Sequence, residues 1–188
     1  AEHFAGQAIG ADPEWPFSYY VRALVLVHRG KLDDAARQMQ RVIELAPADA
    51  DYHWLLAAID VGRNRSEAAV DAARIGLQHD PQHVNCLNLI ARERTRSGHL
   101  AEAGSLVRAS LEIEPTKAET LTLLGELQMR EGDVAGARQS FDQSLMMAPG
   151  DPDAQSGLSE ARRAGNAVYR RLLPLLLVGE KATRDEPI

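Results

Sequence analysis

The stretch AETLTLLGELQMREGDVAGARQSFDQSLMMAPGD, residues 118–151, holds the clearest copy of a unit that recurs along this chain of 188 residues. Its proline belongs to a series with a constant spacing of 34 residues: Pro13, Pro47, Pro81, Pro115 and Pro149. A fixed period of this size is typical of helical repeat arrays, in which each unit packs against its neighbours.

Other landmarks keep the same spacing. Each copy has a small residue near its start and a second small residue 12 positions later: Ala23 and Ala35, Ala57 and Ala69, Ala91 and Ala103, Gly125 and Ala137. Between them comes a residue that tolerates the left-handed conformation ending a helix: Gly30, Asn64, Gly98 and Gly132. Small residues permit close helix packing, and the proline stops the second helix. The pattern predicts helix, short turn, helix.

This pattern resembles the tetratricopeptide repeat (TPR) family, whose small–glycine–alanine–aromatic–proline spacing recurs at Gly125, Gly132, Ala137, Phe141 and Pro149. The resemblance implies an all-α, right-handed superhelical solenoid of antiparallel helix pairs. The chain departs from the family where a large aromatic is expected on the first helix; that position holds Leu26, Asp60, Arg94 and Gln128. Either the repeats pack more loosely there, or the polar residues face water.

The register divides most of the chain into four full repeats, at 16–49, 50–83, 84–117 and 118–151. Residues 1–15 are predicted to be the second helix of an incomplete repeat, with an N-terminal capping helix as the alternative. Residues 152–180 are predicted to form a partial repeat and a capping helix, and residues 181–188 a tail. The apolar run Leu172–Val178 is shorter than the roughly 20 residues of a membrane span. Its alternatives are a membrane-proximal or partner-docking helix, or the start of a C-terminal domain.

Composition argues against several functions. The net charge of −6 argues against bulk nucleic-acid binding, and a single cysteine, Cys86, excludes an internal disulfide and a thiolate zinc cluster. No phosphate-binding glycine loop or nucleophile elbow occurs, and Pro81 separates His79 from His83 in a predicted turn. We therefore expect no enzyme activity, no cofactor and no metal site. The compartment stays open, with the cytoplasm slightly favoured over the periplasm.

The TPR resemblance also implies that the first helices line a concave groove. By register, the predicted partner-binding residues are Phe17, Tyr20, Leu24, Trp54, Asn85, Asn88, Arg92, Arg96, Glu126 and Arg130. We expect the groove to bind an extended or helical segment of another protein. An apolar anchor of that segment is expected near Tyr20 and Trp54. An acidic part is expected near Arg92 and Arg96, because arginine suits carboxylates and the nearby asparagines suit a peptide backbone.

Two alternatives apply to these residues. An upstream helix or another copy of the chain would turn Phe17, Tyr20 and Trp54 into core or oligomer contacts. The arginines would form an ordinary solvated face if they pair with Glu93 or neighbouring acids. The clamp with which some TPR domains hold chaperone tails needs cations that the corresponding positions do not supply, so we do not expect chaperone-tail binding.

The sequence as a whole favours a non-catalytic protein–protein interaction scaffold. One alternative is the interaction or regulatory arm of a larger enzyme or membrane-anchored protein, with membrane contact only through a flanking region. The other is a self-assembling oligomeric scaffold, because open-ended repeats favour head-to-tail contacts between copies.

Overall fold

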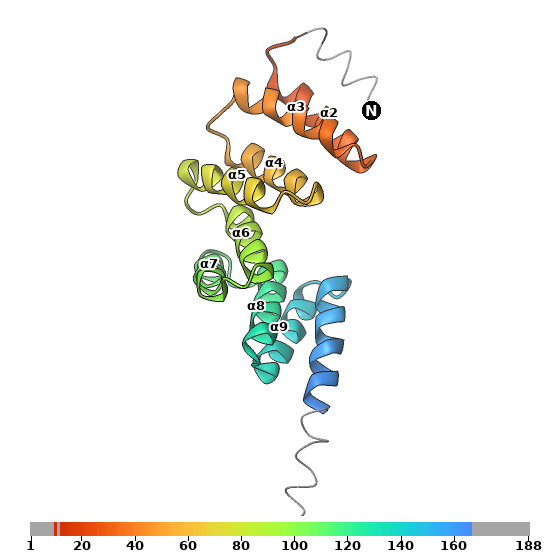
Figure 1. Cartoon of the computed structure of the whole chain (residues 1–188), viewed down its shortest axis with the longest axis vertical. Coiled ribbons are helices and arrows are strands. Elements are labelled where there is room, and N and C mark those ends of the chain that lie inside the picture. Colours follow the sequence, from red (N-terminus) through yellow and green to blue (C-terminus); the bar gives the residue numbers. More distant parts are fainter. Residues whose placement is uncertain (1–9, 11, 167–188) are drawn as a thin grey trace, which may run out of the picture. The chain divides into compact units, whose positions relative to one another are not determined.

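The computed structural model describes residue 10 and residues 12–166, and the regular structure in this part of the chain is helical (Figure 1). Successive helix pairs are α2 (Pro16–His28) and α3 (Leu32–Leu45), α4 (Ala50–Gly62) and α5 (Ser66–His79), α6 (Val84–Arg96) and α7 (Leu100–Ile113), and α8 (Ala118–Glu131) and α9 (Val134–Met147). A further helix covers residues 152–166. The predicted N-terminal half-repeat, capping helix and tail lie largely outside the described residues.

The helices fall into two compact units, Ala1–Pro115 and Thr116–Ile188, divided at the turn between α7 and α8. In the first unit α2 packs on α3, α4 on α5 and α6 on α7, and each pair also contacts the next. In the second unit α8 packs on α9. Contacts between neighbours in sequence are the pattern expected of a repeat array.

The turn inside each repeat is closed in the same way. Each contains one residue with positive φ: Gly30 (72°), Asn64 (58°), Gly98 (83°) and Gly132 (85°). In the second repeat the N–H of Arg65 donates to the carbonyl of Asp60 at 2.9 Å, and the equivalent bonds of the other repeats measure 2.8–2.9 Å. This is the hydrogen bond of a Schellman helix end. The predicted breaks are confirmed, and Asn64 takes the place of glycine.

Small residues lie where the helices approach most closely. The alanines at both landmark positions have no solvent exposure: Ala23, Ala35, Ala57, Ala69, Ala91, Ala103 and Ala137. Gly125 is also buried, and a Cβ added there would lie 2.6 Å from Cε1 of Phe141. The space that the glycine leaves is therefore filled by the aromatic ring of the same repeat.

Two of the polar residues that replace the family's aromatic are buried and paired. Asp60 and Arg94 are each 7% exposed. Arg63 bonds Asp60 at 2.7 Å and also Asp33 of the preceding repeat at 2.7 Å. Arg94 bonds Glu67, again in the preceding repeat, at 3.0 Å. These two residues do not face water, because ion pairs between successive repeats occupy the place of the missing ring.

Candidate partner-binding surface

Four aromatic rings form a row across the starts of α2 and α4. The ring centroids of Trp15 and Phe17 are 5.4 Å apart, those of Phe17 and Tyr20 6.0 Å, and those of Tyr20 and Tyr52 5.5 Å. These separations lie in the range of about 4.5–7 Å at which aromatic pairs attract each other. We name Trp15, Phe17, Tyr20 and Tyr52 the aromatic row.

The residues around the start of α2 determine where the outer end of the row lies. Pro16 occupies the first turn of α2, where its fixed φ suits a helix start and its missing N–H costs nothing. Trp15, just before it, has extended backbone angles, φ −83° and ψ 105°. The Tyr19 hydroxyl donates to the carbonyl of Pro13 at 3.1 Å and holds the incoming chain against the helix. The tryptophan ring therefore lies beside the helix start, where it contacts Phe17.

The row passes from the core to the solvent. Tyr20 and Tyr52 are partly buried and pack on the apolar cluster of α2, α3 and α4. Trp15 is 49% exposed and Phe17 47%, and Leu24, one turn beyond Tyr20, is 40% exposed. Adjoining exposed aromatic side chains mark a candidate interaction surface, because tryptophan and tyrosine are common hot spots of interfaces.

The structure assembles only part of the predicted binding site for the partner's apolar anchor. The structure brings Phe17 and Tyr20 together, but Trp54 packs, partly buried, against two core clusters. Trp15 and Tyr52 were not among the residues predicted from the sequence. Tyr52 falls outside the groove register, and only its contact with Tyr20 reveals it. One feature of the sequence could have indicated Trp15: it is an aromatic residue directly before a proline that starts a helix.

On α6, Asn88 corrects the prediction. Its side chain is fully buried, and its Oδ1 accepts a hydrogen bond from the Ser110 hydroxyl of α7 at 2.8 Å. In this repeat the side chain at this register position points between α6 and α7 and not outward. The predicted contact of Asn88 with a partner backbone is therefore wrong.

The other predicted residues of α6 are more accessible. Asn85 and Arg92 are half-buried, and Arg96 is exposed. Arg96 bonds Glu93 at 2.8 Å, and this nearly buried carboxylate also accepts from the Ser66 hydroxyl at 2.6 Å. Arg96 therefore has an acidic partner within the fold, although more than half of its side chain reaches solvent.

The last two predicted residues lie on α8 in the second unit. Glu126 is half-buried, and Arg130 is exposed in the last turn. Thr122, on the same helix, is buried and bonds Ser144 at 2.8 Å and Asp151 at 2.9 Å. Some groove positions of α8 are thus used to hold the second unit together.

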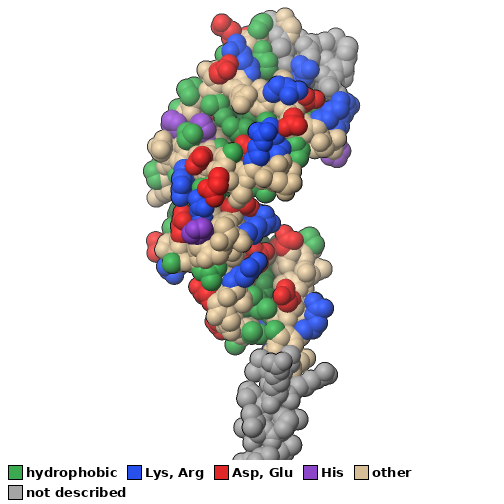
Figure 2. Space-filling model, in the orientation of Figure 1, with side chains coloured by type: hydrophobic (Ala, Val, Ile, Leu, Met, Phe, Trp, Pro, Cys, Tyr) green, Lys and Arg blue, Asp and Glu red, His purple; other side chains and the backbone are tan. Residues whose placement is uncertain are grey.

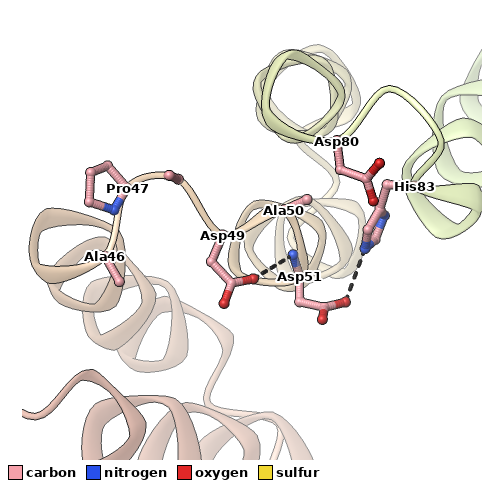
Figure 3. Close-up of a pocket in the computed structure, with 8 residues that line it drawn as sticks. Ala46, Pro47, Asp49, Ala50, Asp51, Asp80 and His83 are labelled. Carbon is pink, nitrogen blue, oxygen red and sulfur yellow. Dashed lines mark hydrogen bonds and ion pairs between the residues drawn. The ribbon is translucent and has the colours of Figure 1, made fainter.

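A hollow of about 530 Å³ lies beside the start of α4, lined by Ala46, Pro47, Ala48, Asp49, Ala50, Asp51, Asp80 and His83 (Figure 3). Asp49 caps α4 by accepting the N–H of Asp51 at 3.0 Å. His83 Nδ1 accepts the N–H of Cys86 at 3.2 Å, so the ring proton is on Nε2 and is donated to Asp51 at 3.0 Å. We name this site the acidic hollow, because three of its side chains are carboxylates.

Two carboxylates of the acidic hollow, Asp49 and Asp51, lie near Tyr52 at the inner end of the aromatic row. Burial raises the pKa of the Tyr52 phenol, and the nearby Asp49, Tyr20 and Asp51 raise it further. The phenol therefore stays protonated at neutral pH. This end of the row combines a ring with nearby negative charge.

The buried thiol has no reactive character. Cys86 has no solvent exposure. Burial raises the pKa of Cys86 to about 12, and Asp51 and Asp80 act in the same direction. The thiol is therefore protonated at neutral pH, whereas the thiolate is the nucleophile and metal ligand. Within residues 12–166 no group of three or more His, Cys, Asp or Glu side chains is arranged to hold a metal ion.

The face of the molecule seen in Figure 2 is mixed in charge. Figure 2 shows Lys and Arg side chains interspersed with Asp and Glu side chains over the visible face. None of the described helices has both the length and the hydrophobicity needed to cross a membrane.

Comparison with known proteins identifies the repeat. Two family models, each described as tetratricopeptide repeat, match residues 20–84 and 95–164. The chain is 23% identical over 143 residues to the protein CTR9 homolog of Arabidopsis thaliana, and 27% identical over 140 residues to the BBSome complex member BBS4 of Xenopus tropicalis. These matches cover 76% and 71% of this chain but 13% and 26% of those proteins. The chain thus spans only a minor part of their length.

Solved structures agree with the fold. TTC0263, a thermophilic TPR protein of Thermus thermophilus, has a TM-score of 0.71 at 17% identity, over 85% of this chain and 88% of that one. YrrB, a TPR protein with an unusual peptide-binding site, has a TM-score of 0.63 at 17% identity, over 82% and 80%. Together with the 34-residue period and the helix pairs, these matches show that the chain belongs to the tetratricopeptide repeat family and is an all-α, TPR-like solenoid.

Proposed function

We propose that this chain is a non-catalytic protein-interaction scaffold whose aromatic row receives an apolar side chain of a partner segment. The TPR fold suggests a protein–protein interaction scaffold in general. One observation carries the finer proposal: four rings contact one another in series, and the outer two, Trp15 and Phe17, are each close to half exposed.

The row is suited to binding because it is already in place. Tyr20 and Tyr52 rest on the core, so a partner does not have to order them. Preformed contact residues lower the entropic cost of association. YrrB, described as having an unusual peptide-binding site, supports the idea that this fold can take a peptide.

We place the acidic part of the same extended or helical segment near Arg92 and Arg96 on α6. Carboxylates suit the guanidinium fork. Arg96 already bonds the nearly buried Glu93, so a partner carboxylate would share its exposed guanidinium and form a solvent-exposed ion pair. Such pairs contribute about 0–1 kcal/mol, whereas an aromatic hot spot contributes about 2 kcal/mol or more. The aromatic row therefore supplies most of the affinity.

The chain's short span relative to the CTR9 and BBS4 proteins favours a second proposal, that it acts as the interaction arm of a larger protein. The two proposals are compatible, because the aromatic row would serve the same purpose in either setting.

A peptide selection from a random display library on the whole chain tests the proposal. Selected peptides are then titrated by fluorescence anisotropy against the wild type and Phe17→Ala. Loss of the ring should weaken binding by about 2 kcal/mol, roughly 30-fold. Ile75→Ala is the matched control, since Ile75 on α5 is 41% exposed and lies outside the row. Equal binding by Phe17→Ala and the wild type, or no selected peptide, would overturn the proposal.

Sedimentation of the same variants separates a foreign partner from self-assembly. Self-association of the wild type that Phe17→Ala abolishes and Ile75→Ala retains would assign the row to a second copy of the chain. If every variant stays monomeric, the partner that binds the row is a different protein.

A further inference from the structure

We infer that the segment bound at the aromatic row carries a lysine or arginine next to its apolar anchor, with the cation lying over the rings and beside the acidic hollow. This inference rests on the proposed function, and it names the chemistry of the partner. Its basis is that carboxylates lie near both ends of the row, beside the exposed Trp15 at one end and near the partly buried Tyr52 at the other.

At the outer end, Trp15 lies close to two acids in the chain. Asp12 and Glu14 are both exposed, and the N–H of Glu14 donates to the Asp12 carboxylate at 3.1 Å. That bond holds the Asp12 carboxylate close to the backbone of the turn leading to Pro16. The largest exposed ring of the row therefore lies in a locally negative segment.

At the inner end, the carboxylates of the acidic hollow are held in place by hydrogen bonds. Asp49 accepts the N–H of Asp51, and Asp51 in turn accepts the Nε2–H of His83. Asp80 accepts the N–H of Gln82 at 3.0 Å. Figure 3 shows the Asp51 and Asp80 carboxylates on different sides of the His83 ring. Negative charge at this end is thus fixed in position before a partner arrives.

Arg41 of α3 contacts Tyr19 of α2, while several other basic residues of the first unit lie at the far ends of the first helices of the repeats. They follow α2 at Arg29 and Lys31, and they end α6 at Arg94 and Arg96. Arg22, the cation nearest to the row along α2, is half-buried. Acids at helix starts and bases at helix ends complement the helix dipole. That local role explains the charges but not the exposed rings between the acids.

A cation satisfies both features of this surface. Lys and Arg are attracted to the faces of Trp, Tyr and Phe rings and pair with carboxylates. A segment that is only apolar would leave the carboxylates without a new partner, and an acidic flank would be repelled. Each cationic contact at an exposed site is worth a few-fold in affinity. We therefore expect about a five- to tenfold preference for a basic flank.

The preference also gives the segment a direction. Its basic residue lies at the starts of α2 and α4, and its acidic part lies toward Arg92 and Arg96, in the second half of α6. A segment with the reverse order of charges would place like charges together at both ends.

Three peptides of identical length test the inference: acetyl-Gly-Xaa-Phe-Leu-Xaa-Gly-amide with arginine, glutamine or glutamate at both Xaa positions, labelled with fluorescein. Anisotropy titration against the whole chain should rank arginine over glutamine by about five- to tenfold, and glutamine over glutamate. The preference should shrink as salt is added, because exposed charges are screened.

The variant Asp49→Asn/Asp51→Asn removes two charges and keeps both the α4 cap and an acceptor for His83, since asparagine is an equally good cap. It should reduce the arginine preference to under twofold. The control Asp153→Asn/Glu160→Gln removes two exposed acids from the helix at residues 152–166 and should keep it.

The outcomes separate the inference from the proposed function. Equal affinity of the three peptides, with binding lost in Phe17→Ala, overturns the inference and leaves the proposed function standing. A preference for glutamate, or an arginine preference that survives Asp49→Asn/Asp51→Asn, overturns the inference as well. Binding of no peptide, or binding that Phe17→Ala does not change, overturns both.

Discussion

Replacing Gly125 by alanine tests whether the approach of α8 to α9 depends on a missing side chain. A Cβ at this position would lie 2.6 Å from Cε1 of Phe141 and 2.8 Å from its Cδ1 and Cζ. The ring is 1% exposed. It cannot move toward the next helix, because a Cβ at Gly157 would lie only 2.4 Å from the same Cζ. Phe141 is held between two glycines.

Two effects of opposite sign decide the result. Alanine favours the helix over glycine by about 1 kcal/mol. Overpacking of a filled core costs roughly 1–3 kcal/mol, and three ring atoms inside van der Waals distance place this site at the upper end. We expect Gly125→Ala to lower the free energy of unfolding by about 2 kcal/mol. For a chain of this size the Tm then falls by roughly 4–8 °C.

Thermal and urea unfolding, followed by far-UV circular dichroism, measure the change. Gly165→Ala is the matched control in the same unit, because its Cβ would meet Cγ1 of Val134 at an ordinary 3.8 Å. Its Tm should stay the same or rise. The double variant Gly125→Ala/Phe141→Leu should be less destabilised than the sum of its single variants. A Gly125→Ala chain as stable as the wild type would refute the packing argument.

Three further predictions concern single side chains of the first unit. Asn88→Ala should lower the free energy of unfolding by roughly 1–3 kcal/mol in urea, because it removes the buried hydrogen bond from Ser110; lost peptide binding at full stability would instead restore Asn88 as a groove residue. Cys86, with its pKa raised to about 12, should react with a thiol reagent at pH 8 only after denaturation, and fast labelling of the folded chain would contradict its burial. The hydrogen bond from Arg94 lowers the pKa of Glu67, so its stabilisation is complete above the ordinary glutamate pKa of about 4.3 and is lost as the pH falls through the lowered value. Glu67→Gln should lack this loss in acid unfolding, and a pH profile identical to the wild type would show that the pair adds nothing.

Much of the fold was predictable because its signals are local. The turn at Asn64 could be placed from one residue type, since only glycine and asparagine adopt positive φ readily. The buried ion pairs of Asp60 and Arg94 could not be placed in this way. Their partners include residues on other helices, and nothing in the spacing indicates that a charged residue is buried with a counterion.

Less of the candidate surface was predictable. Phe17 and Tyr20 follow from the register, but Tyr52 joins them only because the fold brings its ring on α4 to 5.5 Å from the Tyr20 ring on α2. The acidic hollow likewise combines residues before α4 with residues before α6. Such neighbours in space are separated in the chain by about one repeat.

By itself the sequence determined the helix–turn–helix period, the turn positions and the close-packed small residues. These depend on backbone conformation and side-chain size within one repeat. Only the tertiary structure decided which side chains reach solvent, because exposure depends on what the adjacent helices place there. Three residues at the same register position show the difference: Tyr20 is half-buried in the aromatic row, while Asn88 and Thr122 are buried and hydrogen-bonded to the second helix of their own repeats.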